Sequence, residues 1–283
     1  MTIQSASEIT SHILVLGVGG TIAGVARDPS KPFTYTAGQL EIGAILEKLG
    51  AGLPSSVKLV SRQMANIDSG DLSEELLTQI ANTVIDELPN PLLKGIVITH
   101  STDTVEETGF FLDSTCGKLA EKLGKRVVLT GAMLPSNAAR ADGPQNLADA
   151  IQWADTAPEN CPGGVFAVFA GKVCMARDLA KRHTNTFNAP LMDSPYSTTG
   201  LINPSWLSRV KAVQSALSED LPVPQGVGLG WRLLLAILAH GRSLSMRCSE
   251  RVLRGWCWPA QEWAAFISHG WGLSNKRRFM VLA

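Results

Sequence analysis

The sequence predicts an α/β fold in which helices flank a mainly parallel β-sheet. Short apolar runs rich in Val and Ile recur along the first 190 residues, as is typical of buried parallel strands. Between these runs, apolar residues follow the spacing of amphipathic helices. Strands and helices that alternate in this way form βαβ units, whose strands lie parallel in one sheet.

Four strands and three helices are predicted from these patterns. Each strand is a nearly continuous apolar run, which is expected to be buried on both faces. The second helix has Thr104 and Glu107 at the spacing of a capping box. In chain order the strands are "HILVLG" (12–17), "KGIVITH" (94–100), "KRVVLTGA" (125–132) and "GGVFAVFAG" (163–171), and the helices are 73–88, 104–123 and 143–155.

The composition gives no support for nucleic-acid binding, membrane insertion or a cysteine-bound metal. The 283 residues are 45% hydrophobic and 18% charged with a formal net charge of zero, so nothing favours nucleic acid or an anionic membrane surface. No apolar run approaches the roughly 20 residues that span a bilayer. The five cysteines show no metal-type spacing. We therefore expect reduced thiols and a cytoplasmic protein without a secretory leader, although a periplasmic mature form stays open.

Ligands of parallel sheets bind in the loops that follow the strands, and the first such loop is "GVGGTIAG" (17–24). It is not a complete dinucleotide fingerprint, because Ile22 stands at the third glycine position, and it has no Walker lysine. Two interpretations stay open. The loop is a tight turn in which Gly19 and Gly20 adopt positive φ angles, or its backbone approaches a substrate and exposes Thr21 as a nucleophile.

Hydroxyl side chains also gather after the second strand, in "ITHSTDTVEET" (98–108). A helix N-cap needs only one Ser, Thr or Asp. Here a carboxylate stands among several hydroxyls, which suits a site that binds an amino group and activates a nucleophile. His100 is expected to pack rather than to catalyse. The cluster consists of Ser101, Thr102, Asp103 and Thr104.

The third and fourth loops add a helix start and a lysine. The stretch "GAMLPSNAARADGPQNL" (131–147) contains prolines and glycines and opens a helix near Asn146. In "ARDLAKRHTNTFNAP" (176–190), basic residues alternate with hydroxyls. Lys181 either lies on a solvated face or enters the site, where it pairs with Asp103 and accepts or relays a proton.

Together these stretches resemble the bacterial asparaginase and glutaminase-asparaginase family in order and spacing. The resemblance covers roughly residues 11–200 and rests on "GGTIAG", "THSTDTVEET", "TGAMLPSNAARADGPQNL" and "ARDLAKRHTNTFNAP". It implies an amidohydrolase that converts L-asparagine to L-aspartate and ammonia, with L-glutamine as a further candidate substrate. It also implies a homotetramer without a metal, an organic cofactor, or a nucleic-acid or membrane partner.

The resemblance assigns a role to individual positions. Thr21 matches the nucleophile that forms an acyl-enzyme, and Tyr35 matches a tyrosine of the loop that closes over the site. Thr102, Asp103 and Lys181 match a second triad, in which the aspartate also binds the substrate's α-ammonium group. The other candidate substrate-binding residues are Gly20, Ser69 (for the α-carboxylate), Gly70 (where glutamine is common) and Ser101 (where glycine is usual).

The C-terminal region departs from the family. Residues 201–283 hold six of the seven tryptophans and ten Lys and Arg against four Asp and Glu. The family's smaller α/β domain supplies an asparagine and a glutamate to a neighbouring site, and neither motif is found after residue 200. We therefore expect residues 1–200 to form the catalytic domain, and the second domain to be absent or disrupted by a frameshift, a truncation or divergence. An active asparaginase and a weak or inactive, amino-acid-binding homologue both stay open.

Overall fold

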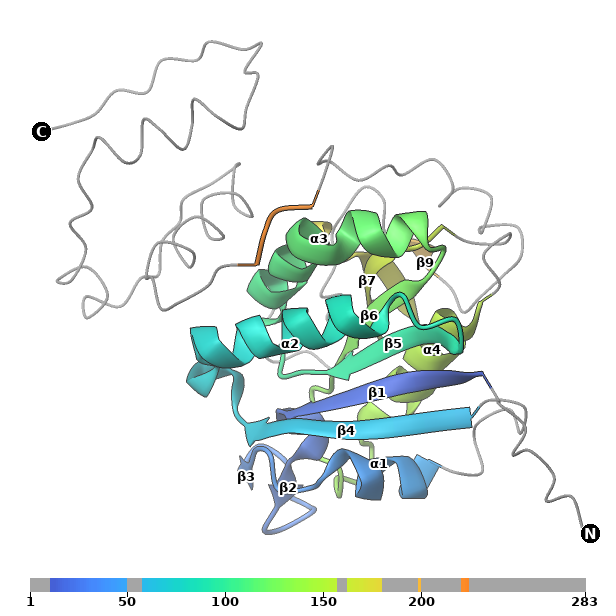
Figure 1. Ribbon diagram of the computed structural model, residues 1–283. Helices are drawn as coiled ribbons and strands as arrows, with labels where there is room; N and C mark the ends of the chain where they lie inside the picture. Colours follow the sequence, from blue (N-terminus) through green and yellow to red (C-terminus); the bar gives the residue numbers. More distant parts are fainter. Residues whose placement is uncertain (1–10, 50–57, 157–161, 180–197, 200–219, 224–283) are drawn as a thin grey trace, which may run out of the picture. The chain divides into compact units, whose positions relative to one another are not determined.

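The structure is a computed structural model in which part of the chain is described (Figure 1). Every residue that the structure describes lies within the first 241 residues of the chain. The irregular structure predicted after residue 200 falls almost entirely outside the described residues, and the domain boundary near residue 200 stays a prediction. No helix among the described residues is long and apolar enough to span a membrane. The described residues are 11–49, 58–156, 162–179, 198–199 and 220–223.

A seven-stranded sheet forms the centre of the described part, and its first five strands run parallel. The last two strands pair antiparallel at one edge. The predicted α/β fold with a mainly parallel sheet is therefore confirmed. In spatial order the strands are β4 (Lys58–Ile67), β1 (His12–Gly19), β5 (Leu93–Thr99), β6 (Arg126–Thr130), β7 (Gly164–Phe169), β8 (Lys172–Met175) and β9 (Thr198–Thr199).

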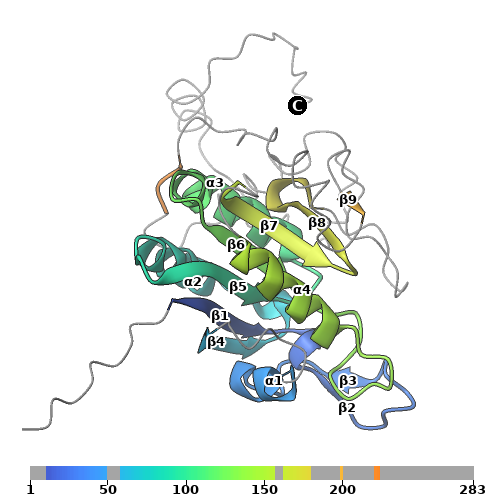
Figure 2. The same cartoon turned by 90° about the vertical axis from the view of Figure 1, so that its right-hand side faces the viewer.

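Helices cover both faces of the sheet. One face is packed by α2 (Glu74–Glu87) and α3 (Val105–Lys122), the other by α1 (Ile42–Leu49) and α4 (Gly143–Asp155), as Figures 1 and 2 show. Side chains alternate between the faces along each strand. Along β1, Leu14 and Leu16 pack on the α2–α3 side, whereas Ile13 and Val15 pack on the α1–α4 side. Both layers of core are therefore built from the same apolar runs.

The strand order reverses beside β1, the strand that carries the glycine loop. From β1 the chain passes through α1 to β4 on one side, and then through α2 to β5 on the other side. At such a reversal the loops after two neighbouring strands leave toward opposite faces, and ligands bind between them. The loops after β1 and β5 meet this condition, so the topology itself selects them.

All seven elements predicted from the apolar pattern are present. The sequence analysis missed α1, β4, β8, β9 and a small hairpin of β2 (Val25–Ala26) and β3 (Tyr35–Thr36). The predicted capping box at the start of α3 is wrong. Thr104 is the N-cap residue, but its ψ of 18° lies far from the extended value that lets a cap side chain reach the first helical amides, and its side chain makes no cap hydrogen bond.

Candidate active site

Two glycines shape the end of β1. Gly19 and Gly20 have φ values of 111° and 79°, which L-residues rarely adopt. A Cβ on Gly20 would lie 2.6 Å from the backbone nitrogen of Ser101, and the Gly20 amide donates to the carbonyl of Ile67 (2.8 Å). The backbone of the loop after β1 therefore contacts the backbone of the loop after β5. This close approach leaves no room for a side chain at position 20, so it requires glycine there.

Thr21 follows these glycines and begins the short 3-10 turn Thr21–Ala23. Its side chain is buried, with 5% of the residue exposed, and its Oγ1 lies 2.7 Å from the hydroxyl oxygen of Tyr35. The half-buried Tyr35 belongs to β3, and its ring lies against Gly24, where a Cβ would come within 2.8 Å. The predicted nucleophile and the predicted tyrosine are therefore in hydrogen-bonding contact.

The loop of the third motif holds the hairpin that contains Tyr35. Asn137 accepts from the amide of Ala26 and donates to its carbonyl, both at 2.8 Å. The amide and hydroxyl of Ser136 donate to the carbonyl of Gly24 at the same distance. The carboxylate of Asp142 in turn accepts from the loop amides of residues 133 and 134. This motif therefore supports the site, a role that residue types alone did not reveal.

The loop after β5 places a second set of polar side chains beside the first. Ser101 and Thr102 are buried, and the Ser101 hydroxyl donates to the carboxylate of Asp68 (3.2 Å), which follows β4. Asp103 is exposed and directly precedes the N-cap of α3. The contact between Ser101 and Asp68 joins two loops far apart in the chain, and no signal in the sequence pointed to Asp68.

His100 packs, as predicted. Its ring is buried, and its two nitrogens lie 2.7 Å from the carbonyl oxygen of Ser101 and 3.1 Å from the hydroxyl of Thr108. Burial lowers the pKa of His100 below its ordinary value, although the contact with Ser101 acts in the opposite direction. The neutral ring thus ties the end of β5 to the first turns of α3 and is in no position to act as an exposed base.

The remaining candidates are only partly described. Ser69 and Gly70 lie in the 3-10 turn Ser69–Asp71 after β4, and Gly70 is exposed with open space around its Cα. Lys181 lies outside the described residues, so its predicted pairing with Asp103 stays a prediction. The described chain reaches the 3-10 turn Ala176–Asp178, and Ala176 packs on Gly109 of α3.

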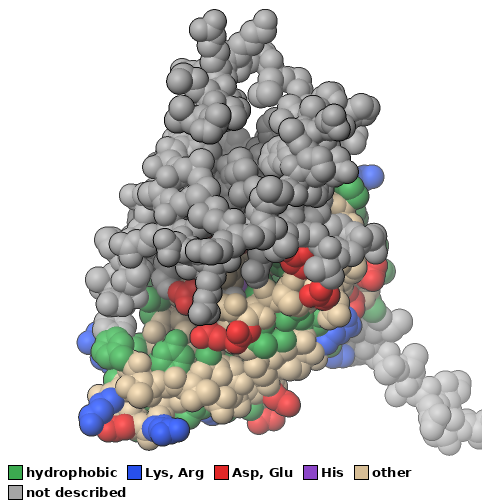
Figure 3. Space-filling view, turned by 90° about the vertical axis from the view of Figure 1, so that its left-hand side faces the viewer, with side chains coloured by type: hydrophobic (Ala, Val, Ile, Leu, Met, Phe, Trp, Pro, Cys, Tyr) green, Lys and Arg blue, Asp and Glu red, His purple; other side chains and the backbone are tan. Residues whose placement is uncertain are grey.

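Figure 3 faces the edge at which the parallel strands end, and acidic side chains are prominent on its described part. Exposed carboxylates of the loops after β4 and β5 include Asp68, Asp71 and Asp103. No group of three or more His, Cys, Asp or Glu among the described residues is arranged to bind a metal ion. The hydroxyl pair of Thr21 and Tyr35 suits nucleophilic attack, and the exposed carboxylates of the loops after β4 and β5 would favour a substrate that carries a positive charge.

The comparison with known families addresses the same residues. The family described as "Asparaginase, N-terminal" matches residues 12–202, about two thirds of the chain. The chain belongs to the asparaginase family. This asparaginase-family region includes β1, β5 and every loop described above.

Named relatives agree with this assignment. The chain is 34% identical to L-asparaginase 2 of Bacillus subtilis, over 62% of this chain and 45% of the relative. It is 32% identical to the glutaminase-asparaginase of Acinetobacter glutaminasificans, over 62% and 52% respectively. The structure also resembles the crystal structure of a probable cytoplasmic L-asparaginase from Campylobacter jejuni, with a TM-score of 0.56 and 34% sequence identity. The match covers 64% of this chain and 53% of that chain. The chain thus spans about half the length of these relatives.

Proposed function

We propose that this chain bears the nucleophile of an asparaginase-type amidohydrolase. In this proposal Thr21 Oγ1 attacks the side-chain carboxamide carbon of L-asparagine, and its proton passes to a neighbouring base. The C–N bond breaks, ammonia departs, and water then cleaves the acyl-enzyme to release L-aspartate. The contact of 2.7 Å between Thr21 and Tyr35, at the reversal of strand order, is the observation that supports this proposal most directly.

Other roles complete the proposed mechanism. Tyr35 is the nearer candidate base, because a general base has to lie within hydrogen-bonding distance of the proton that it accepts. Thr102 and Lys181 form the second candidate pair, and backbone N–H groups near Thr102 would stabilise the developing oxyanion. Asp103 would bind the α-ammonium group and Ser69 the α-carboxylate. The exposure of Asp103 at the strand-end edge is compatible with this role.

Substrate range and assembly extend the proposal. Because one relative is named a glutaminase-asparaginase, L-glutamine is the second substrate to test. A homotetramer and a cytoplasmic location stay predictions. The names of relatives give two different locations. One is a probable cytoplasmic L-asparaginase, and another is a probable periplasmic L-asparaginase of Haemophilus influenzae.

A second candidate function is amino-acid binding with little or no turnover. It is favoured by the sequence of residues 201–283, in which neither motif that the resemblance assigns to the second domain is found. If those motifs are needed to complete the active site, the proposed loops would bind L-asparagine without hydrolysing it efficiently.

The test is ammonia release from L-asparagine and L-glutamine by the purified chain, with binding measured by calorimetry. Thr21→Ala should reduce turnover by about 10³-fold or more, because the covalent route is lost. Thr36→Ala is the matched control, since Thr36 lies beside Tyr35 but its side chain is exposed. Equal turnover in the two variants would refute the role of Thr21, whereas binding without turnover in the wild type would select the second function.

A further inference from the structure

The middle of α3 has a sequence that weakens a regular helix. Residues 114–117 are Ser, Thr, Cys and Gly, all of which are poorer helix formers than Ala or Leu. The hydroxyl of Thr115 donates to the carbonyl of Phe111 (2.9 Å), and the thiol of Cys116 contacts the carbonyl of Leu112 (3.0 Å). Side chains that bond four residues back in this way compete with the backbone ladder and bend helices.

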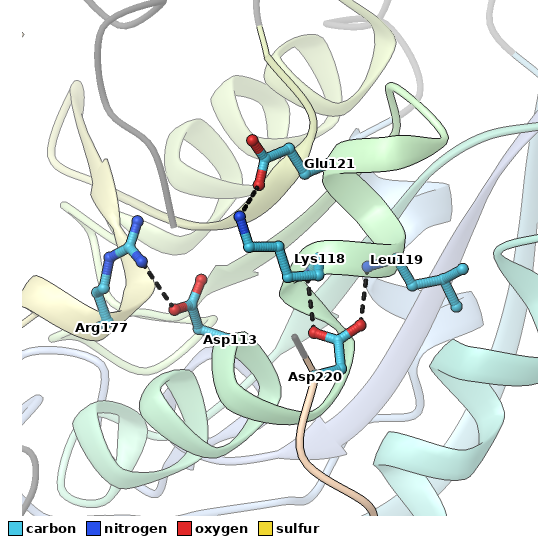
Figure 4. Close-up of polar contacts among 6 residues, drawn as sticks. All are labelled: Asp113, Lys118, Leu119, Glu121, Arg177 and Asp220. Carbon is cyan, nitrogen blue, oxygen red and sulfur yellow. Dashed lines mark hydrogen bonds and ion pairs between the residues drawn. The ribbon is translucent and has the colours of Figure 1, made fainter. Parts of the chain in front are cut away.

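A segment distant in sequence bonds to α3 at this point (Figure 4). The amide of Lys118 donates to one carboxylate oxygen of Asp220 (2.7 Å), and the amide of Leu119 donates to the other (2.8 Å). The amide of Leu221 donates to the carbonyl of Ser114 (2.7 Å). In a regular helix the Lys118 amide would bond to the Ser114 carbonyl. Residues 220 and 221 therefore bond to both members of a pair that would otherwise bond to each other.

These three helical groups, the carbonyl of Ser114 and the amides of Lys118 and Leu119, form what we call the α3 notch. A carboxylate that accepts from two consecutive amides makes charge-assisted hydrogen bonds, which are stronger than neutral ones. An apolar contact adds to them, because Val223 packs on the core cluster beneath α2 and α3 while Pro222 is exposed. The segment thus makes hydrogen bonds through the Asp220 carboxylate and the Leu221 amide, and it packs on the core through the side chain of Val223.

We propose that the α3 notch is a docking site for a peptide segment that bears a carboxylate, and that Asp220 is the anchor by which residues 220–223 occupy it. The site recognises a carboxylate, the backbone amide of the next residue and an apolar side chain three positions after the carboxylate. It fixes residues 220–223 to α3, the helix that begins in the loop after β5 at the candidate active site. This inference does not depend on the proposed catalytic function.

Hydrogen exchange of the full chain tests the anchor residue by residue. Asp220→Ala removes two hydrogen bonds to an ionised group, so the opening equilibrium of the Leu221 amide should rise roughly 10- to 100-fold. Asp220→Asn keeps one acceptor oxygen and should give an intermediate increase. Asp86→Asn is the matched control, because Asp86 is an exposed acid on α2, and it should leave the exchange of Leu221 unchanged.

Amides of β1 and β5 report whether each variant is folded. If these core amides stay protected while the Leu221 amide exchanges as slowly in Asp220→Ala as in the wild type, the anchor role of Asp220 is wrong. If Asp86→Asn accelerates the exchange of Leu221 as much as Asp220→Ala does, the effect is one of general charge and the proposal is also overturned. Loss of protection in Asp220→Ala alone supports the docking site.

Discussion

Replacing Gly20 by alanine should destabilise the protein, because the added methyl group would enter the contact between the loops after β1 and β5. Gly20 has a φ of 79°, and an L-residue in the left-handed region costs about 1–2 kcal/mol. The new Cβ would also lie 2.6–2.8 Å from the backbone and Cβ of Ser101, and overpacking of this kind costs about 1–3 kcal/mol. The sum is about 2–5 kcal/mol of lost unfolding free energy.

Urea or thermal unfolding of Gly20→Ala measures this loss directly. For a domain of this size it corresponds to a fall in Tm of roughly 4–20 °C. Gly43→Ala is the control, because Gly43 lies in α1 with open space around its Cα. Alanine is favoured over glycine in a helix by about 1 kcal/mol, so this variant should gain stability. A Gly20→Ala variant within about 0.5 kcal/mol of the wild type would refute the close approach of the two loops.

Three further perturbations test separate parts of the structure. Burial raises the pKa of Asp113 to about 6, so the folded protein binds this proton more tightly than the unfolded chain does. Stability should therefore fall by up to about 3 kcal/mol as pH rises from about 4 to 6, and Asp113→Asn should remove this component of urea unfolding curves measured across that range. Asn137→Ala deletes both hydrogen bonds to Ala26 and should cost about 1–2 kcal/mol, with faster amide exchange confined to the β2–β3 hairpin. Lys181→Met should lower kcat for L-asparagine more than it changes the binding of the substrate, and an unchanged kcat would exclude Lys181 from the proposed second triad.

The pH prediction for Asp113 depends on the charges that surround it. Arg177 forms an ion pair with Asp113 at 3.4 Å and opposes the effect of burial on its pKa. The carboxylate of Asp178 acts in the same direction as burial, as do those of Asp220 and Glu121, which Figure 4 shows near Asp113. A wild-type stability that rises between pH 4 and 6 by an amount that Asp113→Asn abolishes would show that the ion pair outweighs burial.

The strands that are buried on both faces could be predicted from sequence because their apolar residues are continuous. β4 could not, since its edge position exposes many of its side chains and its sequence "KLVSRQMANI" has no such run. Without β4 the order of the strands was undetermined, so the reversal beside β1 could not be used to locate a site. The helix α1 has only eight residues and includes a glycine, which makes its periodicity too short to recognise.

In the candidate site, too, features set by neighbouring residues could be predicted from the sequence, whereas contacts between distant residues could not. The glycine loop after the first strand and the hydroxyl cluster after the second are local patterns, and they were sufficient to select the two loops, whereas the roles of Thr21 and Thr102 came from the family resemblance. The contact between Thr21 and Tyr35 was expected only from the family resemblance, because the hairpin has two residues in each strand. The contact of Ser101 with Asp68 depends on tertiary packing across 33 positions, for which a single sequence has no pattern.

The bonds between Asn137 and Ala26 span 111 positions, which has a consequence for biosynthesis. A ribosome delivers the chain from its N-terminus, so the glycine loop and the tyrosine emerge long before the loop that holds them. Contacts of such high sequence separation form late in folding, because their loop-closure entropy has to be overcome first. A nascent chain that ends before residue 137 would therefore present the threonine to solvent without the partner that holds the hairpin in place. The β2–β3 hairpin is therefore held in place only after the β6–α4 connection has been made, well after Thr21 and Tyr35 have emerged.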